Sequence, residues 1–244
     1  MTEKPYDPHD YPPFAVTVDV VILTMVKKTL KILLIQRGQG PFRDAWALPG
    51  GFVLPDEDLR DAALRELKEE TNISDDAIHL EQLGTYGSPE RDPRMRVVTV
   101  AYWAIVPNLD KPIGGGDARH AEVVPVSEIE SGRLRLAFDH EKILTDAIER
   151  MRSKMEYTNV ATNFFEDSFT VSEFRNVYEA AWDTELNPGN FQRKLQQSID
   201  FLTPTGEKSP SESSGGRPAD LYTAGPEKDL SPPLKRSKPK KPNK

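Results

Sequence analysis

The sequence predicts an α/β domain at residues 13–156 and a small, mostly helical domain at residues 157–223, between disordered ends at residues 1–12 and 224–244. Three features predict this arrangement. β-Branched and aliphatic runs flank a helix that is rich in carboxylates, and two short amphipathic helices follow them. The chain then ends in PPLKRSKPKKPNK, which is too polar to bury a core.

The composition is that of a soluble protein with a packed core. Hydrophobic residues make up 37% of the chain and charged residues 29%. Cysteine is absent, which excludes disulfides and thiolate metal sites. No apolar run approaches the roughly 20 residues of a membrane span, and the N-terminal MTEKPYDPHDYPPF is too polar for a signal peptide. We therefore expect a cytoplasmic protein.

Charge is distributed unevenly along the chain. The net charge is −7, but residues 203–244 hold nine Lys or Arg and five Asp or Glu, a net of +4, which leaves −11 for residues 1–202. The basic tail either adds non-specific attraction to nucleic acid or only keeps the protein in solution.

Strands and a closing helix make up most of the first domain. The β-branched runs at residues 15–25 and 31–36 are separated by a short polar segment, as in a hairpin. Apolar residues recur at helical spacing over residues 139–155, which predicts a helix there. Further strands are expected at residues 80–86, 95–106 and 122–126.

The segment at residues 58–71 is predicted to be the functional helix. It is rich in Ala, Leu, Arg, Glu and Lys and contains neither Gly nor Pro. At about 100° per residue, Glu66, Glu69 and Glu70 fall within an arc of roughly 100°, beside an apolar sector that packs inward. Three carboxylates on one patch repel one another unless a cation lies between them.

This carboxylate cluster predicts a divalent-metal site with Glu66, Glu69 and Glu70 as ligands, because hard oxygen donors suit Mg²⁺ or Mn²⁺. Gly50 and Gly51 precede the helix, where the missing side chains let the backbone approach a metal or a phosphate. Arg65 lies one turn before Glu69, and an ion pair between them is expected to orient that carboxylate. The alternative is a solvated acidic helix face.

Residues 51–73 resemble the signature of the Nudix hydrolases. They read G-x5-E-x7-R-E-U-x-E-E-x-x-U, where U is aliphatic, and they depart from the family pattern at Asn72, where Gly is usual. Asn also tolerates the left-handed conformation that ends a helix. The resemblance implies a Nudix α/β/α sandwich, a Mg²⁺ or Mn²⁺ cofactor, and catalytic roles for Glu57, Arg65, Glu66, Glu69 and Glu70.

The second domain has the element order of a winged helix. Thr170 and Glu173 form a capping box before one amphipathic helix, and Asn187 with Pro188 begins another. A Ser/Gly/Pro-rich loop and a short apolar segment follow, and the basic tail comes last. The second helix is expected at residues 189–202, with an apolar face of Phe191, Leu195, Ile199 and Leu202.

The outer face of the second helix carries residue types that read base edges, since Arg reaches guanine and Gln reaches adenine. Residues 156–202 nevertheless hold eight acidic and three basic residues, a net of −5, whereas DNA-binding domains usually show a basic face. A helical dimerisation or packing domain is the alternative. The candidate DNA contacts are Gln192, Arg193, Lys194, Gln196 and, in the loop, Arg217.

Several segments over residues 12–222 are similar to the Nudix-related transcriptional regulators of NAD metabolism. These segments are GTYGSPERDPR, LAFDH, FTVSEFRNVYEAA, NFQRKL and GRPADLY. The resemblance implies an ADP-ribose-binding Nudix domain joined to a winged helix that binds double-stranded DNA. It also implies a homodimer in which ADP-ribose modulates operator binding.

Two further comparisons within the family bear on the substrate and on the residue that assists the attacking water. ADP-ribose pyrophosphatases often have Pro sixteen residues after the signature, and Pro89 stands there. With Arg91 and Arg94 it implies a loop whose cations face a diphosphate, although both arginines are equally compatible with a surface position. Related sequences often have a Glu where this chain has His120, so either His120 or Glu122 is expected to assist the water.

Three functional hypotheses follow. The first is a Mg²⁺-dependent hydrolase that splits ADP-ribose, or a related nucleoside diphosphate derivative, into AMP and ribose 5-phosphate and also regulates NAD-metabolism genes. The second is a non-catalytic repressor that senses ADP-ribose. The third is an ADP-ribose pyrophosphatase whose C-terminal domain only dimerises.

Overall fold

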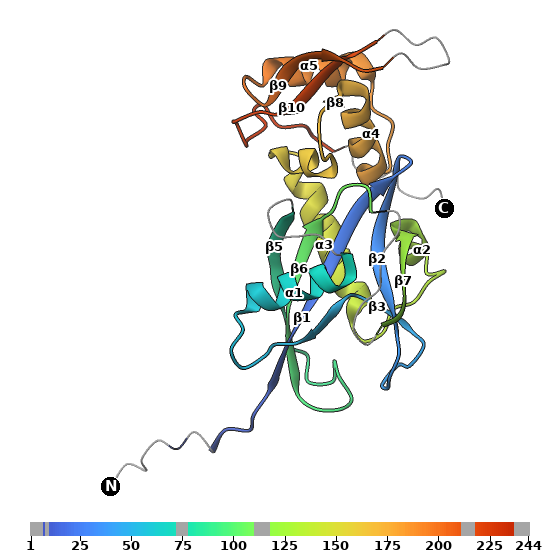
Figure 1. Ribbon diagram of the computed structural model, residues 1–244, viewed down its shortest axis with the longest axis vertical. Helices are drawn as coiled ribbons and strands as arrows, with labels where there is room; N and C mark the ends of the chain where they lie inside the picture. The colour runs from blue at the N-terminus through green and yellow to red at the C-terminus, as the bar shows by residue number, and fades with distance from the viewer. Residues whose placement is uncertain (1–6, 8–9, 72–77, 110–117, 211–217, 237–244) are drawn as a thin grey trace, which may run out of the picture.

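A computed structural model describes residues 7, 10–71, 78–109, 118–210 and 218–236 of the protein. The first domain is built on a seven-stranded sheet with helices on both faces, and the second domain covers one end of it (Figure 1). The expected α/β/α sandwich and the winged helix that follows it are both confirmed.

The sheet of the first domain is organised around its two longest neighbours. Its strands are β1 (Ala15–Val26), β2 (Thr29–Arg37), β3 (Trp46–Ala47), β4 (Gly50–Phe52), β5 (His79–Tyr86), β6 (Val97–Ile105) and β7 (Ala118–Pro125). β1 pairs in parallel with β6 and in antiparallel with β2 and β4. Lys27 and Lys28 join β1 to β2 with φ values of 48° and 62°, as a type I′ hairpin turn requires.

Alternate residues of β1 pack on opposite faces of the sheet. The helices here are α1 (Leu59–Thr71), the short α2 (Val126–Glu130), which the sequence did not predict, and α3 (His140–Lys154). Val20 and Ile22 share a core with Leu67 of α1. Val21 and Leu23 share a second core with α3. The sheet therefore holds the carboxylate helix and α3 on opposite sides.

The second domain is a winged helix. Its elements are η3 (Asn159–Phe164), β8 (Phe169–Thr170), α4 (Val171–Trp182), α5 (Pro188–Gln197), β9 (Leu202–Lys208) and β10 (Asp220–Ala224). The three strands form a small sheet in the order β8-β10-β9. The capping box at Thr170 and Glu173 and the cap at Asn187 are both formed as predicted.

The end of α5 corrects the sequence prediction. The helix stops at Gln197 because Ser198 adopts extended backbone, and Asp200 then turns the chain with a φ of 57°. Ile199, expected in the apolar face, is 81% exposed, and Leu202 begins β9 instead of ending the helix. The buried anchor after the helix is Phe201, which is fully inaccessible.

Residues 225–236 lie within the stretch expected to be disordered, and that boundary is corrected. Leu230 is buried, and its N–H donates to the carbonyl of Tyr157 at 2.8 Å. Leu234 donates to the carbonyl of Glu156 at 2.8 Å, and Arg236 donates to Glu149 at 3.0 Å. Two apolar residues spaced along a polar segment are enough to dock it against the end of α3. Residues 237–244 lie outside the described residues.

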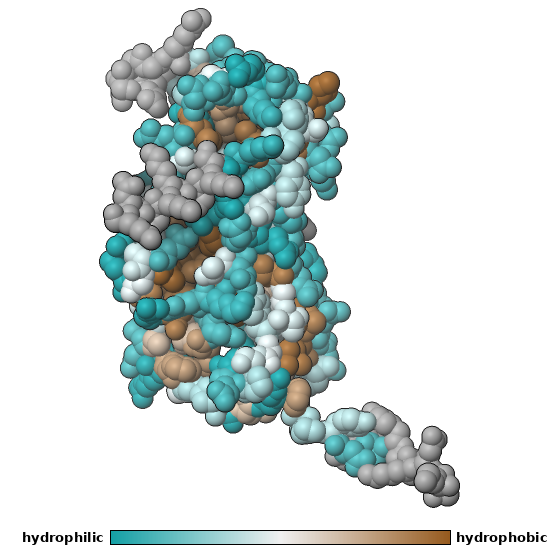
Figure 2. Space-filling model, turned by 180° about the vertical axis from the view of Figure 1, so that it is seen from behind, coloured by the Kyte–Doolittle hydropathy of each residue, from teal (hydrophilic) through white to brown (hydrophobic). Residues whose placement is uncertain are grey.

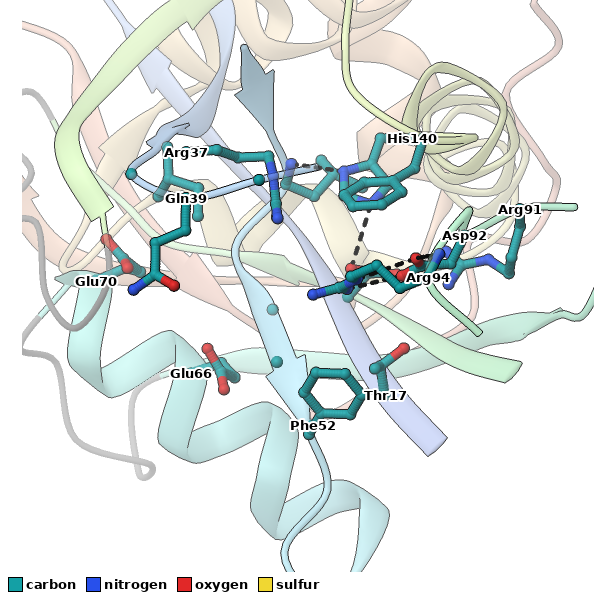
Figure 3. Close-up of a pocket in the computed structure, with 18 of the residues that line it drawn as sticks. Thr17, Arg37, Gln39, Phe52, Glu66, Glu70, Arg91, Asp92, Arg94 and His140 are labelled. Atoms are coloured by element: carbon teal, nitrogen blue, oxygen red, sulfur yellow. Dashed lines mark hydrogen bonds and ion pairs between the residues drawn. The ribbon is translucent and has the colours of Figure 1, made fainter. Parts of the chain in front are cut away.

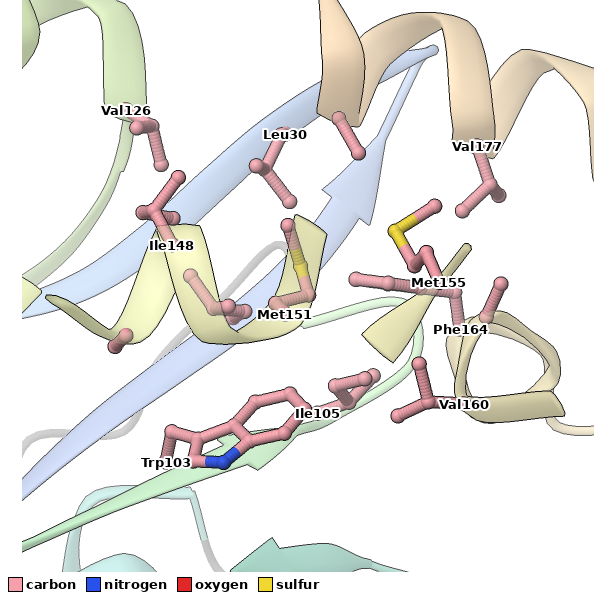
Figure 4. Packing of buried hydrophobic residues seen from close by; sticks show 14 of the residues in the cluster. Leu30, Trp103, Ile105, Val126, Ile148, Met151, Met155, Val160, Phe164 and Val177 are labelled. Atoms are coloured by element: carbon pink, nitrogen blue, oxygen red, sulfur yellow. The ribbon is translucent and has the colours of Figure 1, made fainter. Parts of the chain in front are cut away.

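The two domains share one continuous hydrophobic core. Trp103 and Ile105 of β6, Met151 and Met155 at the end of α3, and Val177 of α4 meet there (Figure 4). Hydrogen bonds reinforce the junction. Arg152 Nε donates to the carbonyl of Ala181 at 2.6 Å, and Trp182 Nε1 donates to the carbonyl of Arg152 at 3.3 Å.

Hydrophilic residues cover most of the face seen in Figure 2, and hydrophobic residues form scattered patches over both domains. The segment before β1 extends away from the body, with Tyr11 and Phe14 exposed (Figure 1 and Figure 2). Among the described residues, no helix has the length and apolar character needed to cross a bilayer.

Candidate functional site

A cavity of about 420 Å³ opens where β1, β2, β4, α1 and the start of α3 meet (Figure 3). Carboxylates of α1 line one side of it. Arginines and aromatic rings line the other. Of the residues predicted from the sequence, the cavity brings together Gly50, Gly51, Glu66, Glu69, Glu70, Arg91 and Arg94.

The carboxylates of α1 differ in exposure. Glu66 and Glu70 are buried, whereas the side chain of Glu69 is 42% exposed. Burial raises the pKa of Glu66, even though hydrogen bonding to Arg65 acts in the opposite direction. Ionising such a buried carboxylate is costly, and a bound cation would stabilise its charged form.

The two glycines are required by close packing. A Cβ on Gly51 would lie 2.5 Å from Oε1 of Glu66, and a Cβ on Gly50 would lie 2.3 Å from the carbonyl of Val18. Any side chain at either position would displace a carboxylate or a strand. The backbone of β4 thereby comes directly against the carboxylate face of α1.

Arg65 forms the ion pair with Glu69 that the sequence suggested, and it contacts two further carboxylates more closely. Its Nε donates to Glu57 Oε1 at 2.8 Å, and its Nη1 donates to Glu66 Oε1 at 2.6 Å. The predicted partner, Glu69, is farther away at 3.6 Å. Glu57 lies in the loop before α1, where Leu54 N–H also donates to it at 3.2 Å. Arg65 therefore ties that loop to Glu66, and the same contacts lower the pKa of Glu57.

The donors fit a divalent cation in kind. They are hard oxygens, two of the three carboxylates (Glu66 and Glu70) are buried, and the backbone at Gly51 approaches Glu66 closely. Within the described part of the chain, no three His, Asp or Glu side chains are gathered at metal-ligand spacing. Arg65 already occupies one oxygen of Glu66.

The arginines predicted to face a diphosphate are both neutralised by protein carboxylates. Arg91 donates to Asp139 at 2.8 Å and to Asp19 at 3.2 Å, and its side chain is only 4% exposed. Arg94 donates to Asp92 through two nitrogens, at 2.7 and 3.0 Å. Pro89 is exposed and does not line the cavity.

The cavity residues that the sequence analysis did not assign include His140, Asp19 and Arg37, which carry charge or can titrate. His140 is buried, and its Nδ1 accepts the N–H of Leu48 at 2.9 Å while its Nε2 lies 3.4 Å from Asp19 Oδ1. Burial lowers the pKa of His140. The one available signal for Asp19 was its own position, as an acidic residue in the middle of the apolar run AVTVDVVILTM. For Arg37, the sequence indicated only a loop-like segment and nothing that pointed to a role in the cavity.

His120 and Glu122, the expected assistants of the attacking water, do not line the cavity. Their side chains are 61% and 54% exposed and lie 3.9 Å apart on β7. Asn72, which departs from the signature, lies outside the described residues.

The predicted DNA contacts lie on the second helix of the winged helix. Gln192, Arg193 and Gln196 are exposed, while Lys194 is half-buried. Arg193 is fixed by a hydrogen bond to Asn190 Oδ1 at 2.9 Å. Arg217 lies outside the described residues.

Comparison with known proteins agrees with this architecture. The family model described as NUDIX domain matches residues 13–147, and the one described as NrtR DNA-binding winged helix domain matches residues 161–224. The ADPR responsive transcriptional repressor NtrR of Acinetobacter baylyi is 36% identical over 219 residues, which span 89% of this chain and 84% of that protein.

Two further relatives match one or both domains. The ADP-ribose pyrophosphatase of Methanocaldococcus jannaschii is 42% identical over 132 residues, covering 54% of this chain and 72% of that enzyme. The crystal structure of Shewanella oneidensis NrtR complexed with a 27mer DNA superposes with a TM-score of 0.76 at 32% identity, over 90% of this chain and 99% of that one. The chain therefore belongs to the Nudix family, in the group whose Nudix domain is followed by a winged helix domain of the NrtR type.

Proposed function

We propose that this chain is a transcriptional regulator that binds ADP-ribose in its Nudix domain, hydrolyses it with Mg²⁺, and binds double-stranded DNA through its winged helix. The observation that carries the proposal is the cavity. It gathers the three signature glutamates, both glycines and several arginines in one place, in a chain whose second domain presents Arg193 and two glutamines outward.

The ligand assignment is supported by the relatives. The similar repressor is named for its response to ADPR, and the similar archaeal enzyme is named an ADP-ribose pyrophosphatase. A diphosphate ester suits a cavity that has carboxylates for a metal on one side and guanidinium groups on the other.

Hydrolysis is supported by the intact carboxylate set. Glu66, Glu69 and Glu70 are the residues that would hold Mg²⁺, and a bound metal supplies polarisation of the diphosphate and activation of a water. Arg65 holds Glu66 toward β4, while the glycine at position 51 leaves room for it. The products are AMP and ribose 5-phosphate.

DNA binding is supported by the exposed face of α5. Arg193 is pre-oriented by Asn190, so less side-chain entropy is lost when it contacts a base edge or a phosphate. The repressor from A. baylyi and the DNA-bound NrtR structure each match about nine-tenths of this chain. A homodimer would place two such helices on one duplex.

A non-catalytic sensor is the second candidate, and two observations favour it. Among the described residues, no three acidic or histidine side chains stand at metal-ligand spacing, and His120 lies outside the cavity. A pyrophosphatase whose C-terminal domain only dimerises is the third candidate, supported by the acidic balance of residues 156–202.

One pair of assays separates the three candidates. Purified protein is incubated with ADP-ribose and Mg²⁺, and AMP release is measured beside a Glu69→Gln, Glu70→Gln variant. The same preparations are titrated onto duplexes from NAD-gene promoters and onto scrambled duplexes, with and without ADP-ribose. We expect turnover that the double variant loses and promoter binding that ADP-ribose relieves. Promoter binding without turnover identifies the sensor, and turnover without selective DNA binding identifies the plain pyrophosphatase.

A further inference from the structure

Arg37 differs from the other two arginines of the cavity in how its charge is balanced. Arg91 and Arg94 are each held by aspartates. Arg37 forms no ion pair with any carboxylate of the described residues. Its Nε donates to the carbonyl of Pro41 at 2.9 Å, which leaves both terminal nitrogens of the guanidinium without a protein acceptor in that part of the chain.

The backbone is arranged to direct Arg37 into the cavity. The pairing of β2 with β7 shifts register between Gln36 and Arg37, and such bulges re-aim side chains beside active sites. Beyond the bulge, Arg37 N–H donates to the carbonyl of Ala45 at 3.0 Å, and Asp44 N–H donates to the carbonyl of Arg37 at 2.9 Å. The side chain extends into the same space as Arg94 (Figure 3).

An aromatic ring holds the guanidinium. The Cζ atom of Arg37 lies 4.7 Å from the ring centroid of Phe138, within cation–π range. Phe138 has a φ of 56°, which is uncommon for a bulky residue and persists only where its surroundings impose it. Phe42 also packs against Phe138 in an edge-to-face arrangement, with ring centroids 4.8 Å apart, and this contact helps to hold the ring in place.

A partly buried cation is costly in a ligand-free protein when no carboxylate contacts it directly, even with the charges of Asp92 and Asp19 nearby. Burial, the largest influence, and the nearby charge of Arg94 lower the pKa of Arg37, and together they outweigh the charges of Asp92 and Asp19, which raise it. An anion that enters the cavity would remove this cost, and a planar guanidinium matches a phosphate through two parallel hydrogen bonds.

We propose that Arg37, oriented by Phe138 and Pro41, is the residue that binds the diphosphate of the ligand, in place of Arg91 and Arg94, whose charges serve the fold. The inference rests on the proposed function, because it takes a nucleoside diphosphate as the ligand. It also explains how one cavity accepts both a metal-binding carboxylate cluster and an anionic ligand. The carboxylates and Arg37 face the ligand from different sides.

The test measures dissociation constants of the full-length protein by calorimetry in the presence of Mg²⁺. All variants are made in the Glu69→Gln, Glu70→Gln background, and the titrations are kept brief, so that the ligand is not hydrolysed during the measurement. The ligands are ADP-ribose, adenosine and inorganic pyrophosphate. Adenosine keeps the base and one ribose but lacks the phosphates. Pyrophosphate keeps the two linked phosphates but lacks the base and the ribose. Arg37→Gln is compared with Arg43→Gln, a neighbouring arginine that is 61% exposed and outside the cavity.

We expect Arg37→Gln to weaken ADP-ribose and pyrophosphate binding by about 10- to 100-fold, the scale of a charge-assisted hydrogen bond, and to leave adenosine unchanged. Arg43→Gln should change none of the three by more than about twofold. Arg37→Lys should recover only part of the loss because it keeps the charge without the planar fork. Equal weakening of adenosine, or no change in ADP-ribose affinity, would overturn the assignment.

The unfolding midpoint provides a second readout. Replacing an arginine that serves only the fold should lower the unfolding midpoint, and we expect this for Arg91→Gln. Ligand-free Arg37→Gln should unfold at the same temperature as the parent protein or higher, and a clear decrease contradicts the proposal. If the parent protein binds pyrophosphate but not ADP-ribose, the anion site stands and the proposed ligand fails. Binding of neither overturns both.

Discussion

Leu48 donates its backbone N–H to Nδ1 of His140 at 2.9 Å, across 92 positions of sequence. The bond fixes the tautomer, because Nδ1 is the acceptor and the proton must then reside on Nε2, which faces Asp19 Oδ1. It also joins the segment before the glycines to the first residue of α3. His140 is thus a neutral positioning residue that holds one wall of the cavity.

The buried imidazole predicts a pH dependence of stability. The pKa of His140 is lowered in the folded protein, so below its unfolded value of about 6.5 the unfolded chain binds a proton that the folded chain does not. Stability should therefore fall as pH drops from about 7 toward 5. His140→Gln should flatten this decline in denaturant midpoints. Part of the decline should remain in that variant, because the pKa of His79 is also lowered in the folded protein. An equal flattening in His120→Gln, an exposed residue, would count against this account.

Replacing Glu66 by Gln should separate stability from activity. Burial raises the pKa of Glu66, so its charge destabilises the metal-free protein at neutral pH, and the uncharged amide should raise the unfolding temperature. Addition of Mg²⁺ should then raise the unfolding temperature of the wild-type protein and leave the variant unchanged. EDTA should abolish AMP release from the wild type. A variant that is less stable without metal would refute this interpretation.

The Arg65–Glu57 ion pair is expected to act on rate more than on binding. Arg65→Lys keeps the positive charge but loses the two-nitrogen contact with Glu57, so Glu66 should lose its fixed orientation. AMP release should slow by roughly 10- to 100-fold, with a smaller change in ADP-ribose affinity. Arg60→Lys on the same helix provides the matched control. A rise in KM with an unchanged kcat would show instead that Arg65 binds the substrate.

Arg193→Ala should weaken binding to the promoter duplex by about 1–3 kcal/mol and reduce discrimination against scrambled DNA. Electrophoretic mobility shifts at two salt concentrations measure both effects. Arg133→Ala, which removes an exposed arginine of the first domain, should leave DNA binding unchanged. If both variants lose affinity equally and only at low salt, the contact is a general electrostatic one.

The sequence located what local spacing determines. The carboxylate face of α1 follows from a helical period, and the caps at Thr170 and Asn187 follow from short-range hydrogen bonds. Arg37 could not be assigned, because its direction depends on a bulge in the pairing of β2 with β7, far apart in sequence. The ion pairs of Arg91 could not be predicted either, because nothing in the chain indicates that Asp19 and Asp139 converge on it.

The junction between the domains has a mechanical consequence. The chain enters the winged helix at Thr158 and returns beside it at Asp229, where the two residues bridge in antiparallel fashion, and Asn159 N–H donates to the carbonyl of Lys228 at 2.7 Å. Two chain segments crossing the junction, together with the shared hydrophobic core, restrict twisting of one domain against the other. A cut in the polypeptide between residues 225 and 229 would remove the second covalent connection across the junction and leave the first at Thr158. Part of the stiffness of the junction between the two domains therefore resides in residues 225–236, where the sequence suggested only a tail.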